Sequence, residues 1–191
     1  MPDCTPESTA AQATALPEAA DRSPAAVEEK VVRLFDEVRV PLLRYLSAFP
    51  LGMADSEDVV QEAFLSLFRS LQDGNHPQNP RGWLFRAAHH LALKKRQRSR
   101  RDPESVECIA NIDAVAIDPA LGPEDQMAFK QSQQRMQSVV RALPERFRWC
   151  LYLRAEGLRY REIAEVVGIS LGSVSQYLER SLALIGRAVQ R

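Results

Sequence analysis

The chain has few cysteines and no long apolar run. Its three cysteines, Cys4, Cys108 and Cys150, are odd in number and widely spaced. That pattern argues against a disulfide framework and against a zinc site of close Cys pairs. No stretch is apolar for long enough to cross a bilayer, and the acidic, Pro-containing N-terminus lacks the basic flank and apolar block of a signal peptide. We therefore expect a cytoplasmic protein without membrane insertion.

Net charge is absent as well, because 25 Lys and Arg balance 25 Asp and Glu. The charge is nevertheless sorted along the chain, since the eight residues from Lys94 to Arg101 contain six cations and no acid. This run directly follows a segment that holds Trp83, Phe85 and two histidines. A solvated helix end is one explanation, and a phosphate-binding segment is the other.

Strand signals are nearly absent, whereas apolar residues recur at spacings of three and four, which predicts an all-α fold. In the first part we expect helices from Val27 to about Phe49, with Pro41 bending or dividing the helix, from a cap at Asp55 or Ser56 to Leu71, and from about Trp83. Further helices are expected at Glu124–Leu143, Pro144–Ala155, Tyr160–Val167 and from Ser170 to near the C-terminus. The buried face of the first helix should contain Val31, Leu34, Phe35, Val38, Leu42, Tyr45 and Leu46, and that of the second Val60, Phe64, Leu67 and Leu71.

Composition divides the chain into four parts. Residues 1–25 are rich in Ala, Pro, Thr, Ser and Glu and have too little apolar surface to fold, so we expect a disordered tail. Residues 102–123 are acidic, hold three prolines and show no helical period, which is typical of a flexible linker. The sequence therefore predicts two small helical domains, at 26–101 and 124–191.

The second domain carries the spacing of a helix-turn-helix. Ala164 is small where two helices must cross closely, Gly168 follows where a left-handed turn is needed, and Val174 is placed to pack back on the first helix. Ser170 is a candidate N-cap for the second helix. An ordinary helix pair with a Gly turn is the alternative, but the supporting apolar pattern favours DNA binding. The residues expected to face the major groove are Leu171, Ser173, Ser175, Gln176 and Glu179.

Two blocks in this order resemble a known family. LPERFRWCLYLRAEGLRYREIAEVVGISLGSVSQYLERSLALIG is similar to region 4 of bacterial RNA polymerase sigma factors. DSEDVVQEAFLSLFRSL and RGWLFRAAHHLALKKRQR are similar to region 2. With only a linker between the two regions, the layout resembles the extracytoplasmic-function (ECF) type. The resemblance implies a promoter-specificity subunit whose partners are core RNA polymerase and promoter DNA, with an anti-sigma factor as a further candidate partner.

The resemblance also implies roles for particular residues. Polymerase contacts would come from Asp58, Gln61, Glu62 and Leu65. The unpaired strand of the promoter minus-10 element would be held by a helix face and its basic end, where rings stack on bases and cations neutralise phosphates. That surface would comprise Trp83, Arg86, His90, Lys94, Lys95 and Arg98. The alternative is that Trp83 belongs to the core and that the cations form a solvated helix end.

The chain departs from the family in both regions. Where the family commonly has Arg-Asn-Leu-Ala-Leu-Asp, this chain has His89 to Lys94, which puts the minus-10 base preference in doubt. The recognition helix lacks the family's Lys and Arg at Ser175 and Tyr177. We therefore expect duplex binding at the minus-35 element to be weaker, or to depend more on Arg154, Arg159, Arg161 and Arg180. The residues predicted for that contact are Arg161, Leu171, Ser173, Ser175, Gln176 and Arg180.

Enzymatic functions are disfavoured. Adjacent histidines on a helix point about 100° apart and cannot chelate one metal as an i, i+4 pair could. No phosphate loop or nucleophile elbow is found, and Cys150 lies in an apolar run typical of a core. We expect no cofactor and no metal. The alternative to a sigma factor is a stand-alone helix-turn-helix regulator or a protein interaction module derived from a sigma factor.

Overall fold

The computed structural model describes residues 24–99 and 122–189. Within these ranges the chain forms helices and no strand, which confirms the all-α prediction. The predicted tail (1–25) and linker (102–123) lie outside the described residues, apart from 24–25 and 122–123. The helices are α1 (Pro24–Leu46), α2 (Met53–Gln72), α3 (Pro80–Ser99), α4 (Pro123–Ala142), α5 (Glu145–Ala155), α6 (Tyr160–Val167) and α7 (Leu171–Val189).

α1 buries the later part of the stripe that the sequence predicts, while Val31, Leu34 and Phe35 are only partly buried against the core. Val38, Leu42 and Leu46 are at most 1% exposed, because residues spaced by three and four share one face of a helix. Of the two alternatives at Pro41, bending or dividing the helix, division is wrong, since α1 continues through it. Proline removes one backbone donor, but residues on both sides of it, such as Val38 and Leu42, are buried and hold the helix against the core.

The start of α2 also differs from the prediction. Gly52 is the N-cap, and neither Asp55 nor Ser56 caps the helix. The backbone N–H of Ser56 donates to the carbonyl of Gly52 at 3.0 Å, so the chain is already helical at that point. The Asp55 carboxylate instead pairs with Lys95 of α3, and this tertiary contact removes it from the competition for backbone N–H groups.

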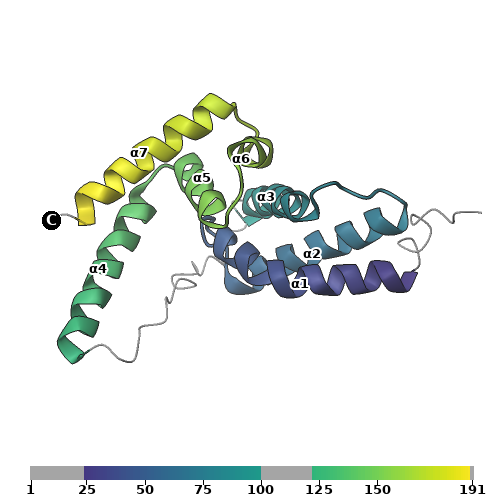
Figure 1. Ribbon diagram of the computed structural model, residues 1–191, viewed down its shortest axis with the longest axis horizontal. Helices are drawn as coiled ribbons and strands as arrows, with labels where there is room; N and C mark the ends of the chain where they lie inside the picture. Colours follow the sequence, from purple (N-terminus) through teal and green to yellow (C-terminus); the bar gives the residue numbers. More distant parts are fainter. Residues whose placement is uncertain (1–23, 100–121, 190–191) are drawn as a thin grey trace, which may run out of the picture.

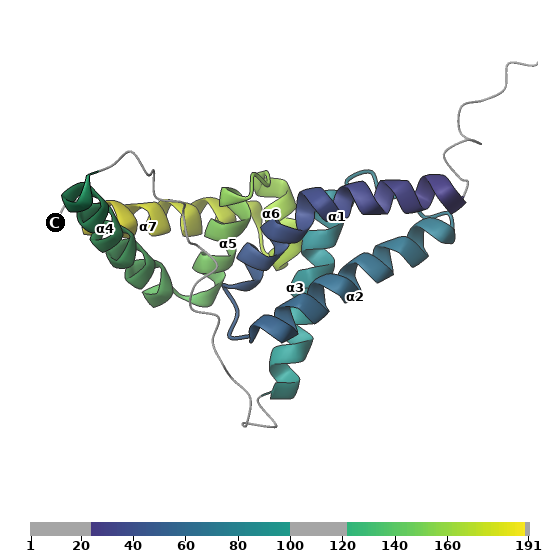
Figure 2. The same cartoon turned by 90° about the horizontal axis from the view of Figure 1, so that it is seen from below.

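Figures 1 and 2 show how the seven helices are arranged. α1, α2 and α3 lie together in the first half (24–99), while α4 and α7 pack together at the far side of the second half (122–189). α5 and α6 lie between them, with α5 against α1 and α6 against α3. No helix in the described ranges has both the length and the apolar character of a membrane span.

One cluster of buried apolar residues includes members of both halves. Phe49, just after α1, stacks on Trp149 of α5 with ring centroids 5.2 Å apart. Cys150, the residue after Trp149, is fully buried, as expected for a core residue. The two halves therefore touch through aromatic side chains, a contact that the pattern of two tethered domains did not predict.

Candidate nucleic-acid and polymerase interfaces

α3 separates into a buried face and an exposed face. Leu84, Phe85, Ala88 and Ala92 are fully buried. Arg86, His90 and Lys94 are exposed and lie at positions i, i+4 and i+8, so they follow one another along the opposite side. Trp83 is partly buried against the core, and it also borders the exposed row. The structure thus brings together the four residues that the sequence places on one face, and it gives Trp83 both a packing role and an accessible edge.

The two histidines of α3 have different surroundings. His89 is 2% exposed, lies with Nδ1 2.6 Å from the Tyr45 hydroxyl, and meets Trp149 edge-on at 4.9 Å. Burial, followed by the charges of His90 and Arg96, lowers the pKa of His89 from 6.5 to about 4. His90 points to solvent and donates from Nδ1 to the carbonyl of Arg86 at 2.7 Å. His89 is therefore a neutral packing residue, and only His90 can face a ligand.

Lys95 is engaged with α2. Its ammonium lies 2.8 Å from a carboxylate oxygen of Asp55 and 2.8 Å from one of Asp58. Partial burial lowers the pKa of Lys95, but hydrogen bonds to these two carboxylates and their charges outweigh that effect and raise it. Arg98, one turn further, is exposed. Of the two cations predicted to bind phosphate here, Arg98 is accessible and Lys95 holds α3 to α2.

α2 presents the four residues predicted to contact polymerase on one outward face. Asp58, Gln61, Glu62 and Leu65 are all exposed, and their spacing of three and four residues aligns them. Leu65 is 52% exposed, so its apolar side chain is available on this face. An apolar residue ringed by acids and an amide is a surface suited to a protein partner.

α6 and α7 form the helix-turn-helix that the sequence predicts. Gly168 has φ 70° and ψ 42°, the left-handed conformation that ends α6, and its N–H donates to the Ala164 carbonyl at 2.9 Å. Val174 is fully buried, so the second helix packs back on the first. The Ser170 hydroxyl accepts from the backbone N–H of Ser173 at 3.1 Å, which confirms it as the cap of α7.

The outward side of α7 is poor in cations. Leu171, Gln176 and Arg180 are exposed, while Ser173 and Ser175 are partly buried. The Ser175 hydroxyl donates to a carboxylate oxygen of Glu179 at 3.2 Å. Arg161 lies on α6 and is exposed. The predicted minus-35 residues of α6 and α7 thus present two cations, Arg161 and Arg180, beside hydroxyl, amide and apolar groups.

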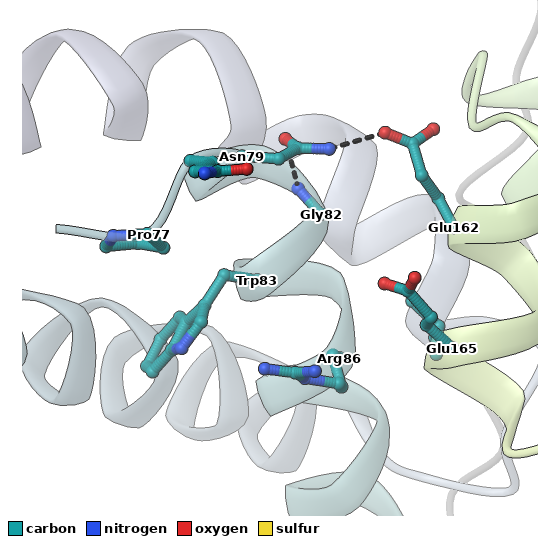
Figure 3. Close-up of a pocket in the computed structure, with 9 residues that line it drawn as sticks. Pro77, Asn79, Gly82, Trp83, Arg86, Glu162 and Glu165 are labelled. Atoms are coloured by element: carbon teal, nitrogen blue, oxygen red, sulfur yellow. Dashed lines mark hydrogen bonds between the residues drawn. The ribbon is translucent and has the colours of Figure 1, made fainter.

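Sequence reasoning missed a cleft between the halves. It has a volume of about 240 Å³ and lies between the loop before α3 and the helix α6 (Figure 3). The sequence had placed Trp83 and Arg86 at a DNA surface, but it held no signal that α6 would face them, because the two segments are about eighty residues apart. The lining residues are Pro77, Gln78, Asn79, Gly82, Trp83, Arg86, Glu162, Glu165 and Val166.

These features define a two-part helical protein with a helix-turn-helix in its second half, and comparison with known proteins gives its family. The family model for sigma-70 region 2 matches residues 34–102, and the model for sigma-70 region 4 matches residues 133–185. The ECF RNA polymerase sigma-E factor of Escherichia coli K12 is 30% identical over 166 residues, which cover 84% of each chain. This chain belongs to the ECF family of RNA polymerase sigma factors.

One further relative agrees with that assignment, and one solved structure shares the fold. The probable RNA polymerase sigma factor RfaY of Xanthomonas campestris pv. campestris is 31% identical over 134 residues, covering 70% of this chain and 34% of that protein. The solved structure of CnrH in complex with the cytosolic domain of CnrY has the same fold, with a TM-score of 0.54 at 23% identity over 91% of this chain and 93% of that chain.

The protein is therefore an RNA polymerase sigma factor, as the sequence predicted. Sigma factors are regulatory initiation factors rather than enzymes, and they work with core RNA polymerase and promoter DNA. The two family matches fall on the two predicted domains, whose exact boundaries stay predictions.

Proposed function

We propose that this sigma factor holds the melted minus-10 strand on the exposed face of α3. The observation that carries the proposal is that α3 has one exposed face and one buried face. Arg86, His90 and Lys94 follow one another in solvent, while the opposite side of the same helix is fully buried. A rigid helix can then present cations at a regular spacing next to the edge of Trp83, where a base can stack.

The other contacts follow from the remaining surfaces. We propose that α2 binds the polymerase through Asp58, Gln61, Glu62 and Leu65. The helix-turn-helix would bind the minus-35 duplex with α7 in the major groove. Here the cations Arg161 and Arg180 would contact phosphate from the edges of a neutral recognition surface.

The domain division at 26–101 and 124–191, with a linker at 102–123, is part of the proposal. So is an anti-sigma factor as a protein partner, since CnrH, which shares this fold, was solved in complex with the cytosolic domain of a second protein, CnrY. We propose the cytoplasm as the compartment, because a sigma factor acts on RNA polymerase at the chromosome.

Promoter opening by reconstituted holoenzyme tests the role of α3. Arg86→Ala combined with Lys94→Ala should reduce permanganate reactivity of promoter thymines on the order of tenfold, because two charge-assisted contacts to the unpaired strand are lost. Binding to closed duplex should change much less. A matched control removes two exposed cations elsewhere, Arg33→Ala with Arg187→Ala. Open complex at the control level in the α3 variant would refute the proposal.

A further inference from the structure

His90 stands between two cations on the exposed face of α3. Arg86 precedes it by one helical turn and Lys94 follows it by one turn, and all three side chains are exposed. At a rise of about 1.5 Å per residue, the positions of the two cations are about 12 Å apart along the helix axis. A DNA strand that runs along this face can therefore meet a cation at each end and pass the imidazole between them.

A hydrogen bond to the backbone fixes the tautomer of His90. Its Nδ1 lies 2.7 Å from the carbonyl oxygen of Arg86. A carbonyl oxygen only accepts, so Nδ1 must carry the hydrogen. In the neutral imidazole the other ring nitrogen, Nε2, then has a lone pair and no hydrogen. Because Nδ1 faces the backbone and the side chain is exposed, Nε2 is presented to solvent as a hydrogen-bond acceptor.

The ring of His90 is also held from the side. His89 meets it edge to face, with ring centroids 5.8 Å apart and ring planes at 89°. His89 is itself buried, with Nδ1 2.6 Å from the hydroxyl of Tyr45 in α1. The backbone hydrogen bond and this ring contact together limit the directions in which Nε2 of His90 can point. The acceptor therefore occupies a defined place on the face.

An acceptor without a hydrogen selects among the groups of a DNA strand. Phosphate oxygens only accept, so they repel Nε2, whereas Arg86 and Lys94 can hold them. Nε2 needs a donor, and the bases supply one. On the base edge that lines the major groove of a duplex, adenine N6 and cytosine N4 are amino donors, while guanine and thymine present keto oxygens at the corresponding places.

We propose that His90 reads one base of the unpaired strand and selects adenine or cytosine there over guanine or thymine. The proposal rests on the role of α3 given above, and it adds the class of base that this face takes. An asparagine side chain, by contrast, carries both a donor and an acceptor and can turn either of them toward a base. Replacing His90 by asparagine should therefore remove the selection without removing the ability to hydrogen-bond.

A selection with reconstituted holoenzyme tests the choice of base. The probe is a DNA pool with a fixed duplex and a run of randomised single-stranded nucleotides, and the bound DNA is sequenced. A mildly alkaline buffer keeps histidine neutral. At one position the wild type should enrich adenine and cytosine about fivefold over guanine and thymine, because one net hydrogen bond is gained.

Two variants give that selection its controls. His90→Asn should lose the preference at that position. Arg86→Ala with Lys94→Ala should retain less DNA of every sequence, since it removes cations that hold phosphate. The absence of such a position in the wild-type selection, or the same preference in His90→Asn, would overturn the proposal.

Exchange of a single group on the base sharpens the test. The probe is a pair of oligonucleotides that differ only at the selected position, where one has adenine and the other hypoxanthine, which carries a keto oxygen in place of the amino group. Wild-type holoenzyme should bind the hypoxanthine strand about fivefold more weakly, and the His90→Asn holoenzyme should bind both strands about equally. Equal binding of the two strands by the wild type would refute reading by His90.

The permanganate assay on Arg86 and Lys94 distinguishes the two proposals. A normal open complex in that variant removes the role of α3, and the reading by His90 with it. A defective open complex, together with the same base preference in wild type and His90→Asn, removes only the reading by His90.

Discussion

α3 and α7 are the two helices proposed to meet DNA, and they do so with different side chains. α3 exposes Arg86, His90, Lys94 and Arg98 next to a tryptophan, whereas the exposed start of α7 has Leu171 and Gln176 with partly buried serines. Cations supply affinity for any phosphate chain, while neutral hydrogen-bonding groups discriminate among bases. From this contrast we propose that the first half supplies more of the sequence-independent affinity and that the second half contributes mainly selection.

The two halves also differ in the size of the side chains that fill their cores. In the first half, large side chains such as Tyr45 and Phe85 are fully buried, with the rings 5.7 Å apart. In the second half, the helix-turn-helix is held by smaller groups such as Ile163 and Val174.

The cores of the two halves should respond unequally to truncation. Phe85→Ala should lower the free energy of unfolding by about 3–5 kcal/mol, because it removes a fully buried ring and leaves a cavity. Val174→Ala should cost much less, since it removes two methyl groups. Urea unfolding followed by circular dichroism measures both, with Val32→Ala, at a 54% exposed position, as the control. Equal losses for Phe85 and Val174 would contradict the comparison.

Polymerase binding should depend on the first half. Asp58→Lys with Gln61→Ala and Glu62→Lys should weaken binding to core polymerase on the order of 100-fold, because reversed charges at a protein interface repel their former partners. Fluorescence anisotropy with labelled sigma factor gives the affinity. Lys95→Ala separates the effect of losing the Asp58 ion pair from the effect of reversing charge. Unchanged affinity in the triple variant would place the polymerase surface elsewhere.

Acid should destabilise the junction between the halves. The folded pKa of His89, about 4, lies below the ordinary 6.5, so the unfolded chain binds the proton more tightly. Stability from this group is present above pH 6.5 and is lost as pH falls toward 4. Between pH 7 and pH 5 the loss should be roughly 2 kcal/mol. Urea unfolding at both pH values should show it in wild type and in His90→Gln, and a smaller loss in His89→Gln. Equal pH dependence in all three would exclude His89 as the cause.

Adding a cation to α7 should make DNA binding by the second half depend more on phosphate contacts, as is proposed for the first half. Ser175→Lys should steepen the salt dependence of duplex binding by about one unit, as expected for one added phosphate contact. The matched control is Ser175→Ala, which removes the hydroxyl that donates to Glu179 without adding charge. Filter binding to minus-35 duplex over a range of salt concentrations measures the slope. An unchanged slope would mean that position 175 does not approach the phosphates.

The smallest effect concerns the two neighbouring cations of α3. Arg98→Ala should reduce the salt slope of single-strand binding by up to about one unit, whereas Lys95→Ala should change it less, because Lys95 is already paired with Asp55 and Asp58. Electrophoretic mobility shifts with single-stranded DNA provide the test. A larger slope change for Lys95 would show that its ion pairs break when DNA binds.

Local patterns were enough for much of the fold. The periods of three and four located all seven described helices, and those of the second half nearly to the residue, because amphipathic spacing reflects which face must be buried. The turn at Gly168 and the cap at Ser170 were equally readable, since both depend on the chemistry of one residue and its immediate neighbours. The predicted cap of α2 at Asp55 was wrong, because the Asp55 carboxylate pairs with Lys95 of α3.

The sequence by itself determined the helical class, the order of the two regions, the helix-turn-helix and the residues that share each helix face. It did so because those features depend on contacts within a few residues. Only the tertiary structure decided that His89 is buried against Tyr45, that Lys95 pairs with Asp55 and Asp58, and that α6 packs against α3. Each of these joins segments far apart along the chain, and no local pattern encodes which of many acids and cations, all alike in sequence, will meet when the helices pack.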